Sequence, residues 1–162
     1  MKSTALPTRS ASCVFCDIVR DEAPASVVYE DDRVMAFMDI QPVNVGHLLV
    51  VPRNHTPDQA SLDEETGGHL FQVGMKLAGA IRRAAPRQSG VRCEGVNLFL
   101  ADGEAAGQEV FHVHLHVIPR FRGDGFGFRF GPDYGRLPGR ATLDEVAAGI
   151  RLFGLGPQMP ES

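Results

Sequence analysis

Several features are scarce or missing in this sequence of 162 residues, and each absence excludes a class of protein. No apolar run approaches the roughly 20 residues of a membrane-spanning helix, so we expect no membrane partner. Basic residues are too few for a general polyanion binder, since 16 Lys and Arg face 20 Asp and Glu, and we expect no nucleic-acid partner. The N-terminus lacks the apolar segment of a secretory signal, which favours a cytoplasmic location.

Cysteine is also scarce, and its spacing is informative. Three cysteines do not suit a disulfide framework. Cys13 and Cys16 form a C-x2-C pair, which in a cytosolic protein indicates a metal-binding or a redox element. Cys93 stands apart, and we interpret it as an ordinary thiol without chemistry.

The apolar pattern predicts strands and two helices. Strand-like segments are the hairpin 26–40, interrupted by Glu30, Asp31 and Asp32, followed by 46–52, 95–101 and 110–118. A long helix is predicted over 61–85, with a capping box of Ser61 and Glu64 at its start and Pro86 after its end. Its apolar residues recur at helical intervals: Leu62, Leu70, Val73, Leu77 and Ile81. A short helix through Phe153 is predicted to open on a second capping box, Thr142 and Glu145.

This order of elements favours a single-domain α+β fold with a mainly antiparallel sheet, one long helix and a short C-terminal helix. We predict a loose tail at 1–12 and a core at 13–120. The remainder, 121–162, is predicted to be a surface loop and a helix packed on the same domain.

The stretch "HVHLHVIPR" concentrates three of the six histidines. If it is a strand, His112, His114 and His116 share one face, and the apolar residues between them face the core. Neutral imidazole can bind a transition metal or act as a nucleophile. Alternate residues lie about 7 Å apart along a strand, which argues against one three-histidine zinc site. The alternative is that one histidine binds a metal and another performs the chemistry.

The C-x2-C pair has the spacing of structural zinc sites, and four-fold coordination then needs two more ligands. Histidines are the available candidates, among them His55. A redox dithiol is the rival interpretation of Cys13 and Cys16. The sequence around them lacks the strand-then-helix context of a thioredoxin-like site.

Two stretches resemble the histidine triad (HIT) family. "AGQEVFHVHLHVIPR" matches its pattern His-φ-His-φ-His-φ-φ, where φ is apolar. "VVYEDDRVMAFMDIQPVNVGHLLVVPRNH" is similar to the N-terminal half of the same family. The resemblance covers roughly residues 13 to 120, and the nearer branch is that of the small Hint-like bacterial proteins. It implies a HIT-like α+β fold, usually as a homodimer whose sheets join across the interface.

The resemblance also implies an activity and the residues that perform it. Family members hydrolyse or transfer nucleoside monophosphates through a nucleotidyl-histidine intermediate. By motif position His114 is the nucleophile, His116 orients the α-phosphate, Gln108 contacts the nucleophile and phosphate region, and His47 lies behind the site. Asp39 is implied to bind the ribose hydroxyls. The implied purine slot is formed by Val14, Phe15, Ile18, Phe37 and Ile40.

In zinc-containing members the metal ligands correspond to Cys13, Cys16, His55 and His112, which implies a structural zinc ion. The expected function is therefore a purine nucleotide hydrolase or phosphoramidase. Alternatives are a dinucleoside polyphosphate hydrolase or phosphorylase, and a non-catalytic zinc-stabilised nucleotide-binding module.

The chain departs from the family pattern at two positions near the site. Ala101 stands where Asn or Gln is usual, and Glu109 replaces a common Ser or Thr. A hydroxyl can donate to a leaving group, whereas a carboxylate donates only when protonated, so the preferred leaving group is open. The arginines of the 121–140 loop are interpreted as a solvated surface; capping of the nucleotide cleft is the alternative.

Overall fold

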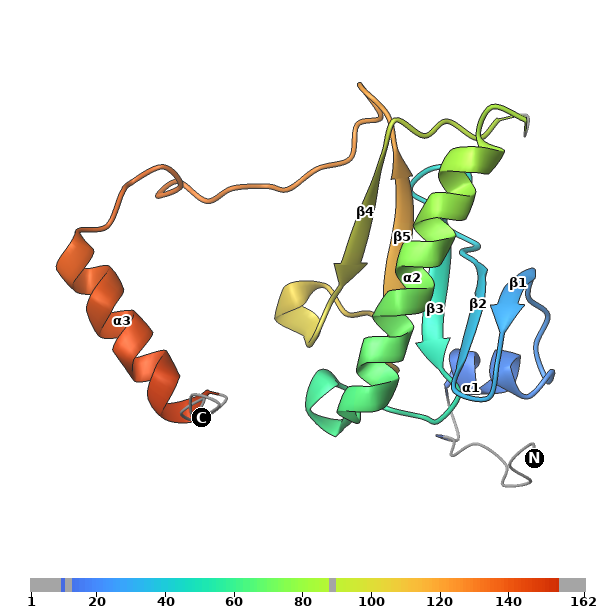
Figure 1. Ribbon diagram of the computed structural model, residues 1–162, viewed down its shortest axis with the longest axis horizontal. Coiled ribbons are helices and arrows are strands. Elements are labelled where there is room, and N and C mark those ends of the chain that lie inside the picture. Colours follow the sequence, from blue (N-terminus) through green and yellow to red (C-terminus); the bar gives the residue numbers. More distant parts are fainter. Residues whose placement is uncertain (1–9, 11–12, 88–89, 155–162) are drawn as a thin grey trace, which may run out of the picture. The chain divides into compact units, whose positions relative to one another are not determined.

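The computed structural model describes Ser10, residues 13–87 and residues 90–154 (Figure 1). Apart from Ser10, the predicted tail at 1–12 lies outside the described residues. The chain divides into two compact units, the first ending at Phe126 and the second beginning at Gly127. The first unit therefore extends six residues beyond the predicted boundary at residue 120.

The first unit is built on an antiparallel sheet, which in the described part of the chain has five strands. The strands are β1 (Val27–Glu30), β2 (Val34–Met38), β3 (Leu48–Pro52), β4 (Gly95–Leu100) and β5 (Leu115–Arg120). Their spatial order is β1-β2-β3-β5-β4, and each neighbouring pair is antiparallel. The predicted α+β fold with a mainly antiparallel sheet is confirmed.

Helices cover both faces of this sheet. The long helix α2 (Glu64–Ala84) lies along one face, as Figure 1 shows, and the short helix α1 (Val14–Val19) packs against the other. Strands β2 and β3 are buried on both faces because their successive side chains alternate between the two cores. Val34 and Val50 belong to the α2 side, whereas Met35 and Val51 belong to the α1 side. This explains why their sequences are continuous apolar runs.

Glycine within α2 permits one close approach to the sheet. A Cβ atom added to Gly74 would lie 2.5 Å from Cδ2 of Leu115. Helix α2 therefore approaches β5 more closely at this turn than any larger residue would allow. Gly68, six residues earlier in the helix, has open space where its Cβ atom would be.

Both predicted capping boxes are wrong. The N-cap of α2 is Asp63, whose side chain accepts from the backbone N–H of Thr66. Ser61 is already bound to Asp58, which caps the short 3₁₀ helix Gln59–Ser61. The last helix, α3 (Arg140–Phe153), starts two residues before Thr142, and its N-cap is Gly139 without a side-chain bond.

The predicted strand at 110–118 is wrong in its bounds, because β5 begins only at Leu115. The chain before it bends instead of pairing in the sheet: the N–H of His112 bonds to the carbonyl of Val110 at 2.9 Å, and that of Val113 to the carbonyl of Thr56 at 2.7 Å. His112 and His114 therefore precede the strand, and His116 lies within it.

The second unit contains α3, preceded by an exposed irregular segment at 127–139. These residues form no helix or strand, as a loop requires, and the predicted surface location of the loop on the domain remains a prediction. Packing of 121–162 onto the same domain remains a prediction, and residues 155–162 lie outside the described part. Within the described residues, no helix combines the length and apolar character that a bilayer span requires.

Candidate functional site

The histidines gather on the sheet face opposite α2. His116 of β5 pairs with Leu49 of β3 and Phe99 of β4, so its side chain projects from the middle of the sheet. The apolar residues between the histidines belong to the α2 core, as alternation predicts: Val113, Leu115 and Val117. The shared face predicted from the sequence is therefore present, although only one of the three histidines is in a strand.

His114 is buried, and one ring nitrogen is committed to the backbone. Its Nδ1 lies 2.7 Å from the carbonyl oxygen of His112. A carbonyl oxygen only accepts, so Nδ1 carries the proton and Nε2 keeps a free lone pair. Burial lowers the pKa of His114, which favours the neutral ring. The Phe15 ring packs against it in a T-shaped arrangement, with ring centroids 5.2 Å apart.

His116 and His47 form a hydrogen-bonded pair. Nε2 of His47 lies 3.0 Å from Nδ1 of His116, and the backbone N–H of Val43 donates to Nδ1 of His47 at 3.2 Å. When Nδ1 of His47 accepts this bond, its proton is on Nε2 and is donated to His116. His116 then carries its own proton on Nε2, where it is a donor. Burial lowers the pKa of His116 to about 4, so the ring is neutral at pH 7.

Asp39 completes this group from the end of β2. Its Oδ2 atom lies 3.3 Å from Nδ1 of His47, and its Oδ1 atom accepts from the N–H of Gln41. Burial lowers the pKa of His47, and the Asp39 carboxylate opposes that shift. Potential ligand atoms of Asp39, His47 and His116 all lie within 4.8 Å of one another. Within this group, His47 and His116 are joined by a hydrogen bond.

Gln108 is buried and bonded to the backbone at both ends of its amide. Its Oε1 atom accepts from the N–H of Gly103 at 2.8 Å, and its Nε2 donates to the carbonyls of Pro57 and Val110. None of these bonds runs to a triad histidine. They hold together the loop that leads to His112, and a contact with the nucleophile or with phosphate remains a prediction.

The residues proposed for the purine slot differ in accessibility. Phe15 and Phe37 are core residues whose ring centroids lie 5.6 Å apart, and Ile18 packs beside them. Val14 is 47% exposed and Ile40 is 92% exposed. Of the five residues, Val14 and Ile40 are therefore the accessible ones, while the two phenylalanines belong to the core.

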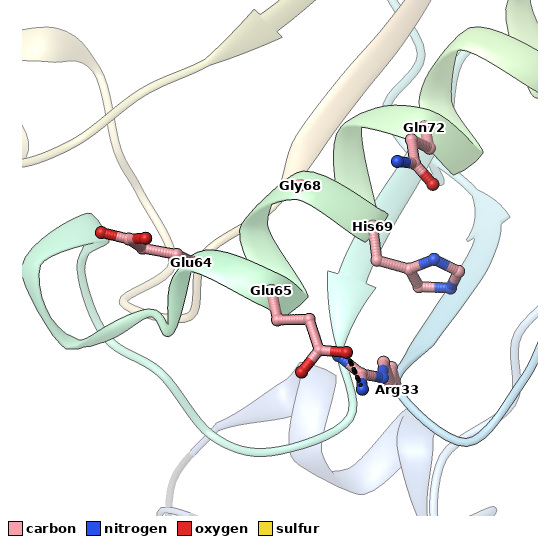
Figure 2. A pocket seen from close by; sticks show the side chains of 6 residues that line it. All are labelled: Arg33, Glu64, Glu65, Gly68, His69 and Gln72. Atoms are coloured by element: carbon pink, nitrogen blue, oxygen red, sulfur yellow. Dashed lines mark hydrogen bonds and ion pairs between the residues drawn. The ribbon is translucent and has the colours of Figure 1, made fainter. Parts of the chain in front are cut away.

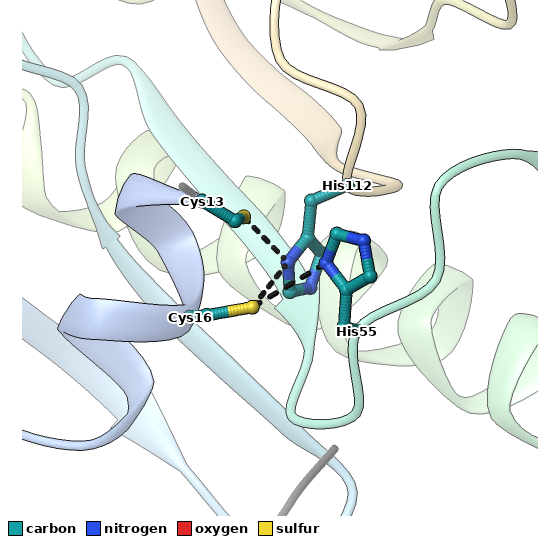
Figure 3. A group of neighbouring side chains, drawn as sticks. All are labelled: Cys13, Cys16, His55 and His112. Carbon is teal, nitrogen blue, oxygen red and sulfur yellow. Dashed lines mark hydrogen bonds between the residues drawn. The ribbon is translucent and has the colours of Figure 1, made fainter. Parts of the chain in front are cut away.

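The four predicted metal ligands lie together (Figure 3). Cys13 caps α1 and Cys16 lies in its first turn, while His55 follows β3 and His112 precedes β5. Sγ of Cys13 lies 3.3 Å from Nδ1 of His112, and Sγ of Cys16 lies 3.3 Å from Nδ1 of His55 and 3.7 Å from Nδ1 of His112.

This geometry fits a tetrahedral zinc ion. Zinc–sulfur bonds of about 2.3 Å and zinc–nitrogen bonds of about 2.0 Å place sulfur and nitrogen ligands about 3.5 Å apart. Nε2 of His112 lies 2.8 Å from the carbonyl oxygen of Pro52, so it carries the proton and leaves Nδ1 free to bind a cation. Burial lowers the pKa of His112 to about 4, which favours this neutral form.

A hollow at the surface lies away from the histidines (Figure 2). It runs beside the first turns of α2 and is lined by Arg33, Glu64, Glu65, Gly68, His69 and Gln72. Two of its side chains have charged or polar partners: Arg33 binds Glu65, and His69 lies 2.6 Å from Asp31. This hollow therefore has the character of a solvated, ion-paired surface.

Sequence reasoning missed the residues that hold the backbone around the site. Pro52 and Thr56 supply the carbonyls that bind His112 and Val113, and Asn44 ties down the loop before His47. No motif marks a backbone carbonyl, so these roles were not visible in the sequence. Asn44 was visible only as a polar residue in a turn.

An antiparallel sheet that presents three histidines at alternate positions on one face fits the histidine triad class of protein. The chain matches the HIT domain family over residues 20–123, and it belongs to this family.

Similar proteins agree with this assignment. The Bacillus subtilis protein named "Protein hit" is 41% identical over 117 residues, covering 72% of this chain and 77% of that protein. A crystal structure of a HIT family protein from Bacillus anthracis has a TM-score of 0.76 at 38% identity, covering 88% of this chain and 96% of that one. A Zn-bound histidine triad family protein from Mycobacterium smegmatis has a TM-score of 0.63 at 45% identity, covering 85% of this chain and 97% of that one.

A relative with a named activity is more distant. Adenylylsulfatase HINT3 from Arabidopsis thaliana is 36% identical over 113 residues, which cover 70% of this chain and 54% of that protein.

Proposed function

We propose that this protein is a purine nucleotide hydrolase or phosphoramidase that cleaves at the α-phosphate through a covalent nucleotidyl-His114 intermediate. The observation that carries the proposal is the bond from Nδ1–H of His114 to the carbonyl of His112. A histidine nucleophile needs a neutral ring with one free nitrogen, and this bond leaves Nε2 free. The lowered pKa of His114 supports the neutral form at pH 7.

The proposed reaction has two displacement steps. In the first, Nε2 of His114 bonds to the α-phosphorus, while the bond to the leaving group breaks and that group keeps the electron pair. In the second, water attacks the same phosphorus, the bond to His114 breaks, and a proton of water is released. His116 would donate from Nε2 to a phosphoryl oxygen and stabilise the charge of both transition states.

For substrate binding, we propose that Asp39 accepts hydrogen bonds from ribose hydroxyls, and that Val14 and Ile40 contact the base. Exposed apolar side chains and a carboxylate are the groups that suit a nucleoside. The Arabidopsis relative named an adenylylsulfatase supports an adenylyl group as the transferred part. We expect Glu109 and Ala101 to influence which leaving group is preferred.

We propose that zinc is bound by Cys13, Cys16, His55 and His112. The ligand spacing and the Zn-bound Mycobacterium smegmatis relative support this assignment. With four protein ligands, bound zinc would act as a structural cross-link. The proposed location is the cytoplasm, where the two thiols stay reduced and available to a metal.

The proposed assembly is a homodimer that joins two sheets along β4. This strand is at the edge of the sheet and its residues are half-buried. Beside it lies an apolar hollow lined by Leu62, Leu70, Phe71, Leu98, Leu100 and Leu115, among others. A sheet edge next to apolar side chains offers both backbone hydrogen bonds and hydrophobic area to a second copy.

A substrate panel tests the proposed activity. The purified protein is assayed with adenosine 5′-phosphoramidate, adenylyl sulfate and diadenosine polyphosphates, and acid-quenched samples are examined for protein-bound AMP. We expect turnover and an adduct in the wild type, and loss of both in His114→Ala. His69→Ala is the control, because His69 pairs with Asp31 away from the triad.

Other outcomes separate the alternatives. A preference for diadenosine polyphosphates would favour the dinucleoside polyphosphate activity. Tight AMP binding without adduct or turnover would favour a non-catalytic nucleotide-binding module. Full activity in His114→Ala would contradict the proposed mechanism.

A further inference from the structure

The segment between β2 and β3 carries two site residues, one at each end. Asp39 directly follows β2 and His47 directly precedes β3. The ends are joined by the bond from Asp39 N–H to the carbonyl of His47, at 3.1 Å. The position of residues 40–46 therefore affects where His47 lies relative to His116.

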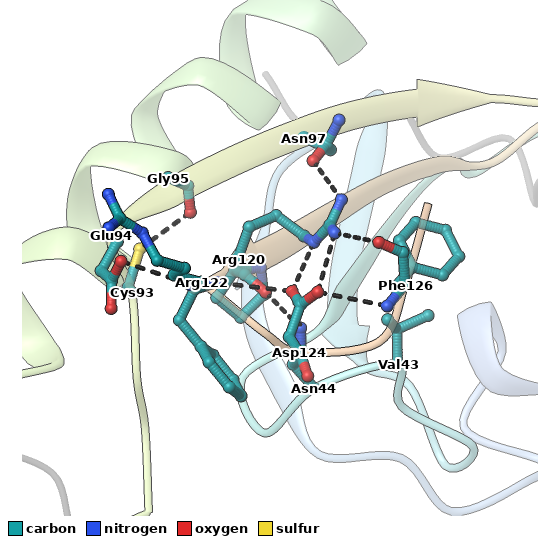
Figure 4. Close-up of polar contacts among 12 residues, drawn as sticks. Val43, Asn44, Cys93, Glu94, Gly95, Asn97, Arg120, Arg122, Asp124 and Phe126 are labelled. Carbon is teal, nitrogen blue, oxygen red and sulfur yellow. Dashed lines mark hydrogen bonds and ion pairs between the residues drawn. The ribbon is translucent and has the colours of Figure 1, made fainter. Parts of the chain in front are cut away.

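One side chain ties residues 40–46 to the rest of the first unit. Nδ2 of Asn44 donates to the carbonyl of Pro119 at 2.8 Å and to Oδ2 of Asp124 at 2.9 Å (Figure 4). The amide thereby donates to the end of β5 and to the segment that follows it. The carbonyl of Asn44 meanwhile accepts from the N–H of His47 at 3.0 Å. Asn44 thus bonds to Pro119 and Asp124 through its side chain and to His47 through its backbone.

The acceptor of this bond is itself rigidly held. Asp124 receives two bonds from Arg120, Nε to Oδ2 at 2.6 Å and Nη2 to Oδ1 at 2.9 Å, and its side chain is 4% exposed. The N–H of Phe126 also donates to Asp124, as Figure 4 shows. A bidentate guanidinium–carboxylate pair fixes the carboxylate in one plane. The bond to Arg120 lowers the pKa of Asp124, so it stays ionised at neutral pH.

The geometry of His47 gives this anchor a chemical consequence. The Val43 N–H reaches Nδ1 of His47 from the same segment. This bond favours the form of His47 that carries its proton on Nε2, facing His116. The Asp39 carboxylate, whose Oδ2 lies 3.3 Å from the same Nδ1, favours the opposite form, so the bond from Val43 is needed to select the proton on Nε2. A displaced segment would weaken that selection, and His116 would lose the bond that sets its own donor nitrogen.

We propose that Asn44 is a positioning residue of the triad site: it holds the 40–46 segment against Asp124 so that His47 orients His116. The proposal rests on the proposed function for its effect on turnover. Its effect on the two imidazole rings does not depend on that function.

The test combines kinetics with spectra of the histidine rings. For Asn44→Ala we expect about a ten-fold lower kcat for adenosine 5′-phosphoramidate with a smaller change in KM, because small displacements of a reacting group have large effects on rate. Long-range 1H–15N spectra should show the His47 and His116 rings leaving the form with the proton on Nε2. Asn44→Ser keeps one donor, and we expect an intermediate effect on both measurements.

The matched control is Asn97→Ala. Asn97 accepts from Nη1 of Arg120 at 2.8 Å, on the side of the guanidinium away from Asp124. Its removal leaves the Arg120–Asp124 pair in place, so we expect the kcat and ring spectra of the wild type. Equal losses in Asn97→Ala and Asn44→Ala would overturn the proposal, because they would indicate a general effect of the network on stability.

Two further results are decisive. Wild-type kcat and ring spectra in Asn44→Ala would overturn the proposal, and if that variant does not fold, the same result in Asn44→Ser does so. If the wild type turns over no nucleotide, the proposed function fails, and the ring spectra of the variants still decide the role of Asn44.

Discussion

Each triad histidine has its ring nitrogens assigned by a different partner. The carbonyl of Pro52 fixes His112, the carbonyl of His112 fixes His114, and the ring of His47 fixes His116. The three side chains share a face, yet the remaining nitrogens differ: Nδ1 of His112 faces the two thiols, whereas Nε2 of His114 is left free for chemistry. These differences support the proposed roles of a zinc ligand, a nucleophile and a phosphate-orienting residue. The alternating pattern of the sequence does not distinguish the three roles.

At this scale we predict that His116 makes folding pH-dependent. Its pKa is lowered from 6.5 to about 4 in the folded state, because burial and the neighbouring His114 and His47 disfavour the cation. Between pH 4 and pH 6.5, His116 is protonated in the unfolded chain but neutral in the folded chain. The free energy of unfolding therefore falls as the pH falls from 6.5 to 4. The loss is on the order of 3 kcal/mol.

Urea unfolding at pH 7 and at pH 4.5 measures this effect. We expect a smaller difference between the two pH values in His116→Gln than in the wild type, because the variant has no ring to titrate. Equal differences in both proteins would assign the acid sensitivity to other groups.

At the scale of elements, α1 depends on what it binds. A helix of six residues is too short to be stable by itself. It supplies both thiols of the cluster, and its Phe15 packs edge-on against His114. A metal ion held by both thiols would anchor this helix, and with it one side of the nucleophile.

We therefore predict that loss of zinc destabilises the protein and lowers its activity. Metal analysis should give about one zinc per chain in the wild type, and Cys16→Ser should lose the metal and several degrees of Tm. Cys93→Ser is the control, since Cys93 bonds to the carbonyl of Gly95 away from the cluster. A stable, active wild type purified without metal would refute the zinc assignment.

Helix α2 provides a second prediction at this scale. Gly74→Ala places a methyl group 2.5 Å from Leu115, so the helix or β5 must shift. We expect a loss of about 1–3 kcal/mol in unfolding free energy. Gly68→Ala in the same helix meets no atom within 4 Å and should stabilise the protein by about 0.5–1 kcal/mol. Denaturant unfolding of both variants measures the two changes in unfolding free energy. A loss of the same size in both would show that the loss in Gly74→Ala is not caused by packing against β5.

At the scale of the whole molecule, we predict a homodimer through the β4 edge. Light scattering after size-exclusion chromatography should give about twice the chain mass of 17.6 kDa. Phe71→Glu puts a charge in the apolar hollow beside β4 and should shift the protein to the monomer. Gln72→Glu is the control, because this neighbouring residue is exposed and does not line that hollow. A monomeric wild type would refute the predicted assembly.

The local pattern of the sequence determined most of the elements. Two apolar runs separated by acidic residues predicted the β1–β2 hairpin, and apolar residues at helical intervals predicted α2. The capping boxes failed because a cap is defined by which backbone N–H a side chain reaches, and Asp63 rather than Ser61 is placed to reach it. The strand at 110–118 failed at its start because Thr56, distant in sequence, takes the N–H of Val113.

The sequence by itself also determined which residue types were available for chemistry: two thiols, a row of histidines and a carboxylate near them. Only the tertiary structure decided which of their atoms meet. Pro52, His112 and Asn44 act through backbone carbonyls, which every residue carries and no motif distinguishes. The nitrogen that each histidine leaves free depends on these long-range partners, because a neutral ring has one donor and one acceptor and the fold chooses between them.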